Sequence, residues 1–347
     1  MKRKVLIAVG GSGGHLLPAQ QLASKLRDSA EILFAGLHLS KSPFFQKESF
    51  SFLDIEAAST SQPLRFLYKS GIGIGQSLKL ISSFRPDVVV GFGSFHSFPV
   101  LAAAVLLRKP IVLYEANCKL GKVNRLFFPF AKLLGLQFPL QGKKISKKHQ
   151  FVSYFPWIKT AKEYTKEEAR AFYGLGDSLP ICLVFGGSQG ASFLNETAPE
   201  SLQGFQVIHC AGKGASLEEI RSHYEKKSIR AFVQHFESDM DRAYRAADFA
   251  LCRSGAATIS ELITHVLPAV LVPYPHAADQ HQRDNAKFFC DEVQGGLWIE
   301  QNEPLRLRSA IELCLERLES FRQSIRLFYQ KTEKRVELAD LVRSLSP

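Results

Sequence analysis

Two segments of the chain, one near the N-terminus and one near the middle, share the same sequence pattern. This repetition constrains the fold more than any other feature. Residues 5–14 read VLIAVGGSGG and residues 181–190 read ICLVFGGSQG. In both cases a short apolar run leads through a glycine-rich turn into a segment that suits a helix. A buried strand followed by a tight turn and a helix is the start of a βαβ unit, whose next strand runs parallel to the first. The repeat therefore predicts an α/β protein with two doubly wound, parallel-sheet lobes.

Apolar runs and helical patterns alternate after each opening, as a parallel sheet requires. In the first half, strands are expected at residues 4–9, 31–35, 52–55, 87–91 and 111–114, and helices at 16–27, 63–84 and 97–107. In the second half, strands are expected at residues 181–185, 206–210, 229–232, 249–252 and 270–272. Residues 141–177 are expected to form the end of the first lobe and the linker, and residues 328–345 one amphipathic helix. The lobes are predicted to span residues 1–156 and 157–327.

The length and composition are those of an ordinary globular protein with two cores. The chain has 347 residues, of which 46% are hydrophobic and 22% charged, and no apolar run approaches the roughly 20 residues that cross a bilayer. The apolar run that starts at Val5 superficially resembles a signal peptide, but the glycines from Gly10 onward end it after a few residues. We therefore interpret this run as the first strand.

The cysteine pattern indicates the cellular compartment, and the net charge indicates the class of binding partner. The 6 cysteines are scattered without CxxC pairs, which indicates a reducing, cytoplasmic compartment without a disulfide framework or a zinc site. The formal net charge of +11 favours anionic partners, which include nucleic acids, acidic lipid headgroups and phosphorylated substrates. Charge alone does not choose among these three classes.

The glycine turns suit phosphate binding, because their backbone N–H groups and the following helix N-terminus attract anions. The alternative is that a tight turn between strand and helix needs glycine in any doubly wound fold. Neither turn contains the GxxxxGK[ST] sequence of a P-loop, and residues 10–15 do not match GxGxxG in register. No acidic residue follows the second strand, which ends in residues 36–38 (GLH). An NAD-dependent oxidoreductase is therefore disfavoured.

Two further features admit a chemical and a structural interpretation. His15 directly follows the first glycine turn, where the helix dipole favours a neutral imidazole that can accept a proton; alternatively it caps the helix. Asp239 and Asp241 form an Asp-x-Asp motif that could hold a metal for a nucleotide sugar. We instead expect them to open a helix at residues 240–247 with Ser238 as its cap, and so predict no metal site and no cofactor.

Residues 252–289 contain the most informative stretch, a strand end, a turn, a helix and a further strand. Glu261 lies on this helix near the turn, and a carboxylate there suits the two vicinal hydroxyls of a ribose rather than a phosphate. The alternative is a solvated glutamate on an outer helix face. Asp279, Gln282 and Asn285 follow the next strand and suit sugar hydroxyls, which both donate and accept hydrogen bonds. Together these residues predict a nucleotide-sugar site.

At these positions the chain resembles the glycosyltransferases of family 28 that transfer N-acetylglucosamine (GlcNAc) from UDP-GlcNAc to undecaprenyl-diphospho-muramoyl-pentapeptide (lipid I), giving lipid II for peptidoglycan. The likeness covers nearly the full length and rests on the order and spacing of residues 10–15 (GGSGGH), 91–94 (GFGS), 115–117 (EAN), 186–191 (GGSQGA), 253–261 (RSGAATISE) and 279–286 (DQHQRDNA). It implies the GT-B fold, two Rossmann-like lobes facing a cleft, with the C-terminal helix at 328–347 packed on the first lobe. It also implies an inverting, metal-independent transfer.

The resemblance assigns roles to individual residues. In the second lobe it implies a diphosphate site at Ser188, Gln189 and Gly190, a second phosphate contact at Ala256, Ala257 and Thr258, ribose at Glu261, GlcNAc hydroxyls at Gln282 and uracil near the backbone of Phe236. In the first lobe it implies acceptor contacts at Ser12, Gly13, Gly14, His15 and Asn117, with His15 as the catalytic base. Ser12, Gly13, Gly14 and Asn117 are also expected near the donor, together with Lys159.

The chain departs from the family pattern at a few positions. Ser12 stands where threonine is common, and Tyr114 and Ala116 replace the usual His and Gln before Asn117. The family's Asn-Pro-Val-Arg segment, whose arginine contacts the donor, reads FPWIK at residues 155–159. Lys159 can supply a point charge there but not the bidentate geometry of arginine.

The lipid acceptor implies a protein on the cytoplasmic side of the cell membrane, held there peripherally. Residues 66–74, 78–85 and 106–109 mix apolar residues with Lys69, Lys79 and Arg85, as an interface with anionic headgroups requires; the alternative is a helix packed on the sheet. Other cell-wall synthesis proteins are further expected partners, and nucleic acid is not. Two alternative functions are a GT-B enzyme with another lipid acceptor and a non-catalytic UDP-sugar-binding protein.

Overall fold

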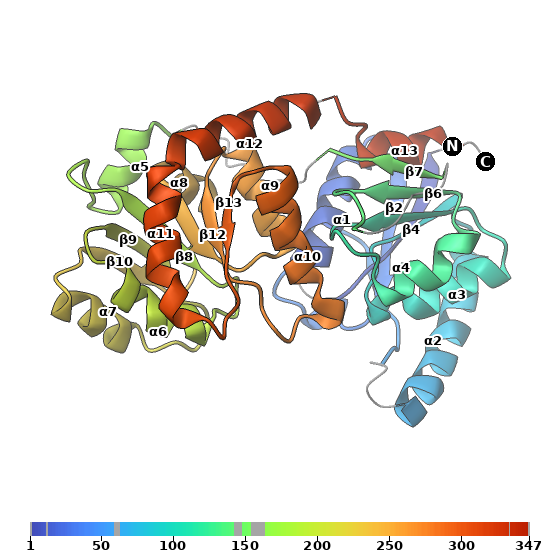
Figure 1. The fold of residues 1–347 in the computed structure, drawn as a ribbon. Helices are drawn as coiled ribbons and strands as arrows, with labels where there is room; N and C mark the ends of the chain where they lie inside the picture. Colours follow the sequence, from blue (N-terminus) through green and yellow to red (C-terminus); the bar gives the residue numbers. More distant parts are fainter. Residues whose placement is uncertain are drawn as a thin grey trace. The chain divides into compact units, whose positions relative to one another are not determined.

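The chain folds into two compact units, each with its own parallel sheet (Figure 1). Unit 1 comprises Met1–Phe155 and Lys334–Pro347, and unit 2 comprises Pro156–Glu333. The chain thus returns to unit 1 at Lys334 rather than at the expected residue 328. The computed structural model describes residues 2–11, 13–58, 63–141, 148–153, 164–332 and 334–345. Ser12 and Lys159 lie outside the described residues.

The sheet of unit 1 has seven parallel strands in the order β3-β2-β1-β4-β5-β6-β7. The central strands are buried on both faces, which explains their nearly continuous apolar sequences. The order reverses beside β1, so that β1 pairs with β2 on one side and with β4 on the other. The strands are β1 (Arg3–Ala8), β2 (Ala30–Gly36), β3 (Phe52–Asp54), β4 (Val88–Gly91), β5 (Ile111–Glu115), β6 (Leu133–Leu136) and β7 (His149–Phe151).

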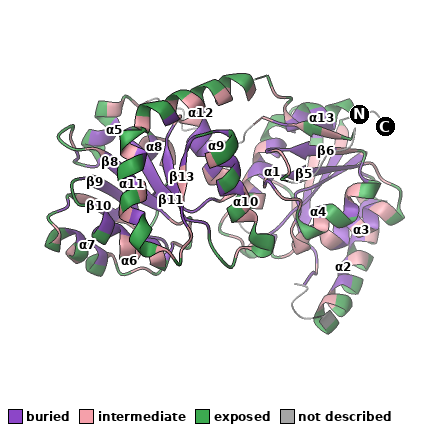
Figure 2. Cartoon of the chain, viewed as in Figure 1, coloured by how far each residue is buried: buried purple, intermediate pink, exposed green. Residues whose placement is uncertain are grey.

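Alternate side chains of β1 enter two different cores, one on each face of the sheet. Val5 and Ile7 pack into the core that includes α1 and α13, whereas Leu6 and Ala8 pack into the core that includes α2 and α3. The helices of unit 1 are α1 (Gly13–Leu26), α2 (Pro63–Phe84), α3 (Phe98–Leu106), α4 (Lys122–Phe127) and α13 (Leu338–Ser344). Buried strands therefore lie between two layers of helices, as Figure 2 shows by colour.

The predicted single helix at residues 328–345 is wrong, because the structure has two helices there. The first, α12 (Leu318–Thr332), ends in unit 2, and the second is α13 in unit 1. Val336 between them forms a parallel bridge with Val152, and the Ser153 amide donates to the Val336 carbonyl at 3.0 Å. A residue that pairs with a strand edge cannot keep helical dihedrals, so the sheet of unit 1 interrupts the helical pattern.

The sheet of unit 2 has six parallel strands in the order β10-β9-β8-β11-β12-β13, with the reversal beside β8. Its strands are β8 (Ile181–Phe185), β9 (Gln206–Cys210), β10 (Ala231–Gln234), β11 (Phe249–Cys252), β12 (Ala269–Leu271) and β13 (Gly296–Trp298). Its other helices are α5 (Lys166–Phe172), α6 (Ser192–Ser201), α7 (Leu217–Lys226), α8 (Met240–Ala246), α9 (Ala256–Thr264), α10 (His281–Lys287) and α11 (Leu307–Glu316). The expected strands at 181–185, 206–210 and 249–252 coincide with β8, β9 and β11.

The expected linker at residues 141–177 contains regular structure that the prediction missed. Its first part includes β7, the edge strand of unit 1, and its second part includes α5 of unit 2. A capping box begins α5, in which Thr165 accepts from the Glu168 amide while the Glu168 side chain accepts from the Thr165 amide. This TxxE signature was present in the sequence and is a recognised helix start. None of the helices in the described part of the chain has both the length and the apolarity needed to cross a membrane.

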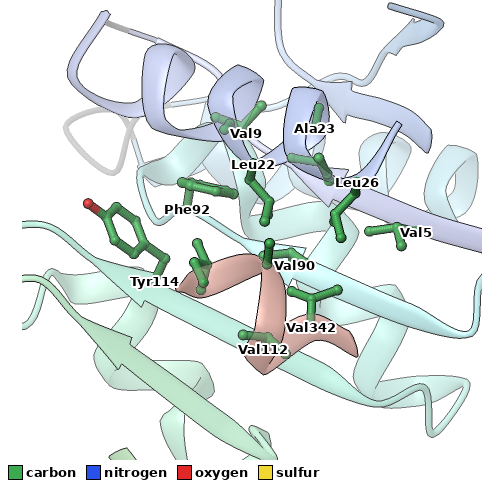
Figure 3. Close-up of a cluster of buried hydrophobic side chains, with 14 of the residues drawn as sticks. Val5, Val9, Leu22, Ala23, Leu26, Val90, Phe92, Val112, Tyr114 and Val342 are labelled. Atoms are coloured by element: carbon green, nitrogen blue, oxygen red, sulfur yellow. The ribbon is translucent and has the colours of Figure 1, made fainter. Parts of the chain in front are cut away.

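The C-terminal helix α13 completes the core of unit 1. Figure 3 shows Val342 of α13 among side chains of α1 and of the central strands, and Leu338 is 1% exposed. Because these residues belong to the core of unit 1, the end of the chain stabilises the lobe in which the chain begins.

We expect Leu338→Ala to lower the free energy of unfolding of unit 1 by about 3 kcal/mol, since it removes buried methyl groups and leaves a cavity. Urea denaturation measures the change. Leu305→Ala is the control, because Leu305 is 94% exposed and its loss should cost less than about 0.5 kcal/mol. Equal stability of the two variants would contradict this account of α13.

Candidate functional site

The first candidate region is the end of the sheet of unit 1 where the strand order reverses. In open α/β sheets, ligands bind outside the carboxyl ends of the strands at such a reversal. The neighbours β1 and β4 both end there, and each leads into a glycine-rich segment, which includes Gly10 and Gly11 after β1 and Gly93 after β4. Parallel pairing thus brings together two motifs that lie far apart in the sequence.

His15 lies in the first turn of α1 and points to the turn after β4. Its Nδ1 lies 2.9 Å from the carbonyl oxygen of Phe92. A carbonyl only accepts, so Nδ1 donates and carries the proton in this arrangement. In the neutral ring Nε2 is then the nitrogen that accepts a proton, as a general base requires. The alternative role of His15 as a cap of its own helix does not account for this hydrogen bond, because the accepting carbonyl of Phe92 follows β4 and lies outside α1.

Two residues that the sequence analysis did not single out complete this end of the sheet. Ser94 has φ 65° and ψ 151°, a conformation that is almost confined to glycine and that is often associated with function. Its Oγ lies 2.6 Å from Nδ1 of His96. The imidazole of His96 packs so closely on the first glycine turn that a Cβ on Gly11 would lie 2.9 Å from its Cε1. Gly11 also has φ +90°, so glycine is required here for two reasons.

The environment of His96 keeps its ring neutral. Burial, followed by the nearby His15 and His38, lowers the pKa of His96 to about 4. A neutral ring beside His15 adds no positive charge to the turn that is expected to meet the acceptor. The motif at residues 91–94 pointed to this region, but no local pattern indicated that a histidine would pack against the first turn.

Asn117 follows β5, next to β4 in the sheet, and a buried carboxylate holds its loop. Glu115 is 4% exposed, and its Oε1 accepts from both the backbone amide and the side-chain amide of Asn117 at 3.1 Å. Its Oε2 accepts from the Gly121 amide at 2.9 Å and from Nδ2 of Asn124 at 3.0 Å. A buried carboxylate with these four hydrogen bonds fixes the conformation of the loop. Sequence reasoning quoted Glu115 within a motif but gave it no task.

Tyr114, which departs from the family pattern, serves the core. Its ring is buried, its hydroxyl donates to Oε1 of Gln137, and burial together with the nearby Glu115 raises its pKa well above the usual range. The tyrosine thus faces inward and remains protonated. Gly13, Gly14 and His15 follow β1, and Asn117 follows β5, so they lie at the carboxyl ends of the two strands that flank β4.

The second candidate region is the equivalent strand end of unit 2. There β8 and β11 are neighbours at the reversal of the strand order, and the turns that follow them are the predicted phosphate contacts. In the turn after β8, Gly187 has φ +87° and Gly190 has φ +78°. A Cβ on Gly190 would lie 2.2 Å from the carbonyl oxygen of Ala211. Both conformation and space therefore require glycine at position 190.

The exposed part of this turn carries Ser188 and Gln189, at the positions that the resemblance assigns to diphosphate. The Ser188 carbonyl accepts from the Lys213 amide at 3.2 Å, which ties the turn to the loop after β9. After β11, helix α9 begins at Ala256 with Gly255 as its N-cap, a residue that has no side chain to cap the first-turn amides. Amide groups of this kind favour an anion. Ala256, Ala257 and Thr258 are all partly accessible.

Glu261 lies one turn further along α9 and is buried. It is 6% exposed, so the alternative of a solvated outer-face glutamate is wrong. The hydroxyl of Tyr244, on α8, donates to its Oε2 at 2.6 Å. A buried carboxylate is stable only with hydrogen-bond donors around it. Tyr244 is a residue that sequence reasoning missed, because it lies on a different helix and carries no motif.

Gln282 and Asn285 on α10 have different roles, because Asn285 is fully buried and Gln282 is not. Oε1 of Gln282 accepts from the Tyr274 amide at 2.9 Å, which orients the amide group so that its Nε2 end donates. Asn285 is fully buried and donates from Nδ2 to the Ser254 carbonyl at 3.0 Å, while Ser254 Oγ donates to the Gln282 carbonyl at 2.7 Å. Asn285 thus fastens the turn after β11 to α10. The expectation that it faces a sugar is wrong.

The remaining expected donor contact lies beyond β10. Phe236 is 48% exposed, and its neighbour His235 holds the loop after β9 by two bonds. The Gly212 amide donates to the His235 carbonyl at 2.9 Å, and Nδ1 of His235 lies 3.1 Å from the Gly212 carbonyl. The backbone near Phe236 is therefore anchored next to the turn that carries Ser188.

The Asp-x-Asp pair is engaged within the protein. Asp239 is the N-cap of α8, so the expected cap at Ser238 is wrong. Its Oδ2 accepts from Tyr164 at 2.6 Å and from Arg242 at 3.1 Å. Asp241 bonds to Arg245 and His265. Both carboxylates are thus held by side chains of the same unit.

Comparison with known proteins relates the chain to one group over its whole length. The family model for the glycosyltransferase family 28 N-terminal domain matches residues 5–135, and the model for the C-terminal domain of that family matches residues 181–341. The UDP-N-acetylglucosamine--N-acetylmuramyl-(pentapeptide) pyrophosphoryl-undecaprenol N-acetylglucosamine transferase of Protochlamydia amoebophila is 35% identical, covering 100% of this chain and 96% of the relative. The protein of the same name from Chlamydia felis is 35% identical, covering 94% of each chain.

Solved structures show the same fold. MurG from Acinetobacter baumannii has a TM-score of 0.76 at 24% identity, with 99% of this chain and 100% of that chain covered. The calicheamicin glycosyltransferase CalG4 has a TM-score of 0.72 at 15% identity, with 99% and 98% covered. At these identities the likeness concerns the fold, two Rossmann-like lobes of the GT-B type, which confirms the predicted fold class.

We expect Gly190→Ala to weaken UDP binding at least tenfold, because the added Cβ forces the turn away from the Ala211 carbonyl and moves the expected diphosphate amides. Calorimetric titration with UDP measures the effect. The matched control is Gly204→Ala, where φ is also positive but no atom lies within 4 Å of the added Cβ. It should cost about 1–2 kcal/mol of stability and leave the affinity for UDP unchanged. Equal affinities in both variants would contradict the diphosphate assignment.

Proposed function

The chain belongs to glycosyltransferase family 28, and from that premise we propose that it transfers GlcNAc from UDP-GlcNAc to the muramoyl sugar of lipid I, giving lipid II. The observation that carries the proposal is the full-length likeness to relatives named for this transfer. It is supported by the two strand-end regions, one for each substrate. The acceptor is assigned to unit 1 and the donor to unit 2.

The donor is held by complementary groups along one edge of the sheet of unit 2. The turn at Ser188, Gln189 and Gly190 and the amides at the start of α9 bind the diphosphate, because both present N–H groups to an anion. Glu261 accepts from the ribose hydroxyls, and Gln282 donates to a GlcNAc hydroxyl. The backbone near Phe236 binds uracil. Lys159 and Ser12, outside the described residues, complete the set by resemblance alone.

The reaction inverts the anomeric carbon in a single displacement. The 4-hydroxyl oxygen of the muramoyl sugar attacks the anomeric carbon from the face opposite UDP, and its proton passes to Nε2 of His15. The new bond to oxygen forms as the bond to the diphosphate oxygen breaks, and UDP leaves with the electron pair. The negative charge that builds on UDP meets the amides of the two turns, which take the part of a metal ion. Gly13, Gly14 and Asn117 bind the acceptor diphosphate.

The Phe92 carbonyl contributes to this mechanism through the tautomer of His15. By accepting from Nδ1 at 2.9 Å, it directs the basic nitrogen toward the reacting hydroxyl and holds the ring in one orientation. The neutral His96 lies next to the same turn.

An assay of UDP release tests the function. We expect release from UDP-GlcNAc with a lipid I analogue and none without it. An enzyme for another lipid acceptor, such as diacylglycerol, would not respond to the analogue, and a UDP-sugar-binding protein would bind UDP-GlcNAc with no release under any condition. His15→Ala should lower kcat by about 100-fold or more and change the affinity for UDP little.

The control for His15 is His223→Ala, an exposed histidine on α7, which should retain full activity. Unchanged turnover of His15→Ala would remove His15 from the chemistry. A large loss of UDP affinity in that variant would instead assign His15 to the binding of the donor.

The lipid acceptor requires the enzyme to work at a membrane surface, and we place it peripherally on the cytoplasmic side. Support comes from the first half of α2, where Leu64, Leu67 and Tyr68 are 84%, 68% and 72% exposed. Their spacing puts these side chains on one face of the helix. The opposite face packs inward, as Phe66 does against Phe98 with ring centroids 5.3 Å apart. Only part of the predicted docking segment is thus available to lipid.

The basic residues of the predicted docking segments also fall into two groups, one paired within the protein and one exposed. Lys69 pairs with Glu56 at 2.8 Å, whereas Lys79 and Arg85 are exposed. An outward apolar face at one end of α2, with exposed cations toward its other end, suits the boundary between headgroups and acyl chains of an anionic bilayer. Contacts with other cell-wall synthesis proteins are part of the proposal by resemblance only.

We expect the double variant Leu64→Asp, Leu67→Asp to lose binding to vesicles that contain anionic lipid, because two carboxylates replace the apolar face. Sedimentation with vesicles measures binding. The control is Leu305→Asp, which alters a residue that is 94% exposed on unit 2 and should bind as the unaltered protein does. Retention of binding by the double variant at physiological salt would contradict docking through α2.

A further inference from the structure

A chain of contacts lies behind the carboxylate of Glu261 and connects α9 with α8. It begins with the hydroxyl of Tyr244, which donates to Oε2 of Glu261 at 2.6 Å. Tyr244 is 2% exposed, and burial together with Glu261 raises its pKa well above the usual range. The hydroxyl therefore keeps its proton and acts as a permanent donor. A hydrogen bond to a buried carboxylate is among the strong ones, and it orients the acceptor.

Two neighbours fix the ring of Tyr244. His265 stacks on one face, with ring centroids 4.7 Å apart and an interplanar angle of 28°. Phe185 packs edge-on, with centroids 5.9 Å apart and an angle of 82°. Phe185 is the last residue of β8, so the ring is anchored to the strand that leads into the turn with Ser188. The tyrosine hydroxyl cannot shift without moving these neighbours.

His265 is itself held at both ring nitrogens. Nδ1 lies 2.9 Å from the carbonyl oxygen of Glu261, and Nε2 lies 2.8 Å from Oδ1 of Asp241. These two contacts fix the orientation of the imidazole. The bond from His265, followed by those from Arg245, lowers the pKa of Asp241 to about 2, and Arg245 holds the other oxygen at 2.9 Å. The stacked ring of His265 is thus held from both α8 and α9.

We propose that Tyr244 is a positioning residue which, supported by His265 and Asp241, sets the Glu261 carboxylate to accept from the ribose 2′-hydroxyl and so makes the enzyme select ribonucleotide over 2′-deoxyribonucleotide donors. The proposal rests on the proposed function in one respect, the assignment of Glu261 to ribose. A carboxylate offers about four acceptor positions, and a donor fixed at one of them determines the plane in which the others lie. Discrimination between hydroxyl and hydrogen needs such a fixed acceptor, because an unmatched buried carboxylate is costly.

The test compares UDP with 2′-deoxy-UDP by calorimetric titration of the full chain. We expect the unaltered protein to bind UDP about tenfold or more tightly than 2′-deoxy-UDP, the effect of one hydrogen bond to a charged group. Tyr244→Phe keeps the stacked ring and removes only the hydroxyl. It should weaken UDP about tenfold, change 2′-deoxy-UDP less than about twofold, and so abolish most of the selectivity. In turnover, the change should appear in KM for UDP-GlcNAc more than in kcat.

A merely structural role gives a different pattern. Tyr224→Phe is the matched control, since Tyr224 is 1% exposed in the same unit and its hydroxyl lies 2.9 Å from Nδ1 of His209. That variant loses a comparable buried bond and should keep the selectivity. Equal loss of both nucleotides in Tyr244→Phe, with its stability lowered as in the control, would overturn the proposal.

Glu261→Gln separates this proposal from the one on which it rests. It should lose the selectivity by itself, and adding Tyr244→Phe should then change nothing further, because the two residues act through one contact. If the unaltered protein binds both nucleotides equally, the assignment of Glu261 to ribose fails and this inference fails with it. If the protein discriminates but Tyr244→Phe does so equally well, only the inference about Tyr244 is overturned.

Discussion

The parallel pairing of β1 with β4, and of β8 with β11, is the constraint on which the rest of both units depends. Each pair lies where the strand order reverses, so the turns after both strands open at the same edge of the sheet. Motifs that are about eighty residues apart in unit 1, and about seventy residues apart in unit 2, become neighbours for this reason. Glycine at these turns is then required by close backbone contacts, as the approach of Gly190 to Ala211 illustrates.

Buried carboxylates organise both edges, although they do so in different ways. Glu115 is surrounded by amide donors of its own loop and fixes the position of Asn117. Glu261 takes a donor from another helix, through Tyr244. Glu115 fixes the conformation of its own loop. Glu261 instead lies beside the first turn of α9, where the nucleotide-sugar substrate is expected to bind. In both cases burial strengthens each hydrogen bond and penalises any that is missing.

Much of the architecture was predictable because continuous apolar runs bounded by glycine are a strong signal for buried parallel strands. β8, β9 and β11 coincide with their predicted ranges. The missed elements include β6, β7 and β13, which are short strands toward the sheet edges, and α5, whose capping box was overlooked. The single helix at 328–345 failed because Val336 pairs with Val152, and a pairing so distant in sequence leaves no trace in local periodicity.

The sequence by itself determined the class of fold and the residues at the strand ends, since a strand, a glycine turn and a helix are encoded by adjacent residues. Family membership followed from the order of these motifs and is confirmed by the comparisons. Only the tertiary structure decided what each polar side chain does there. It turned Asn285 inward, gave Nδ1 of His15 a carbonyl partner and set Tyr244 behind Glu261. Such contacts join different strands and helices, so their energy depends on packing that no local pattern specifies.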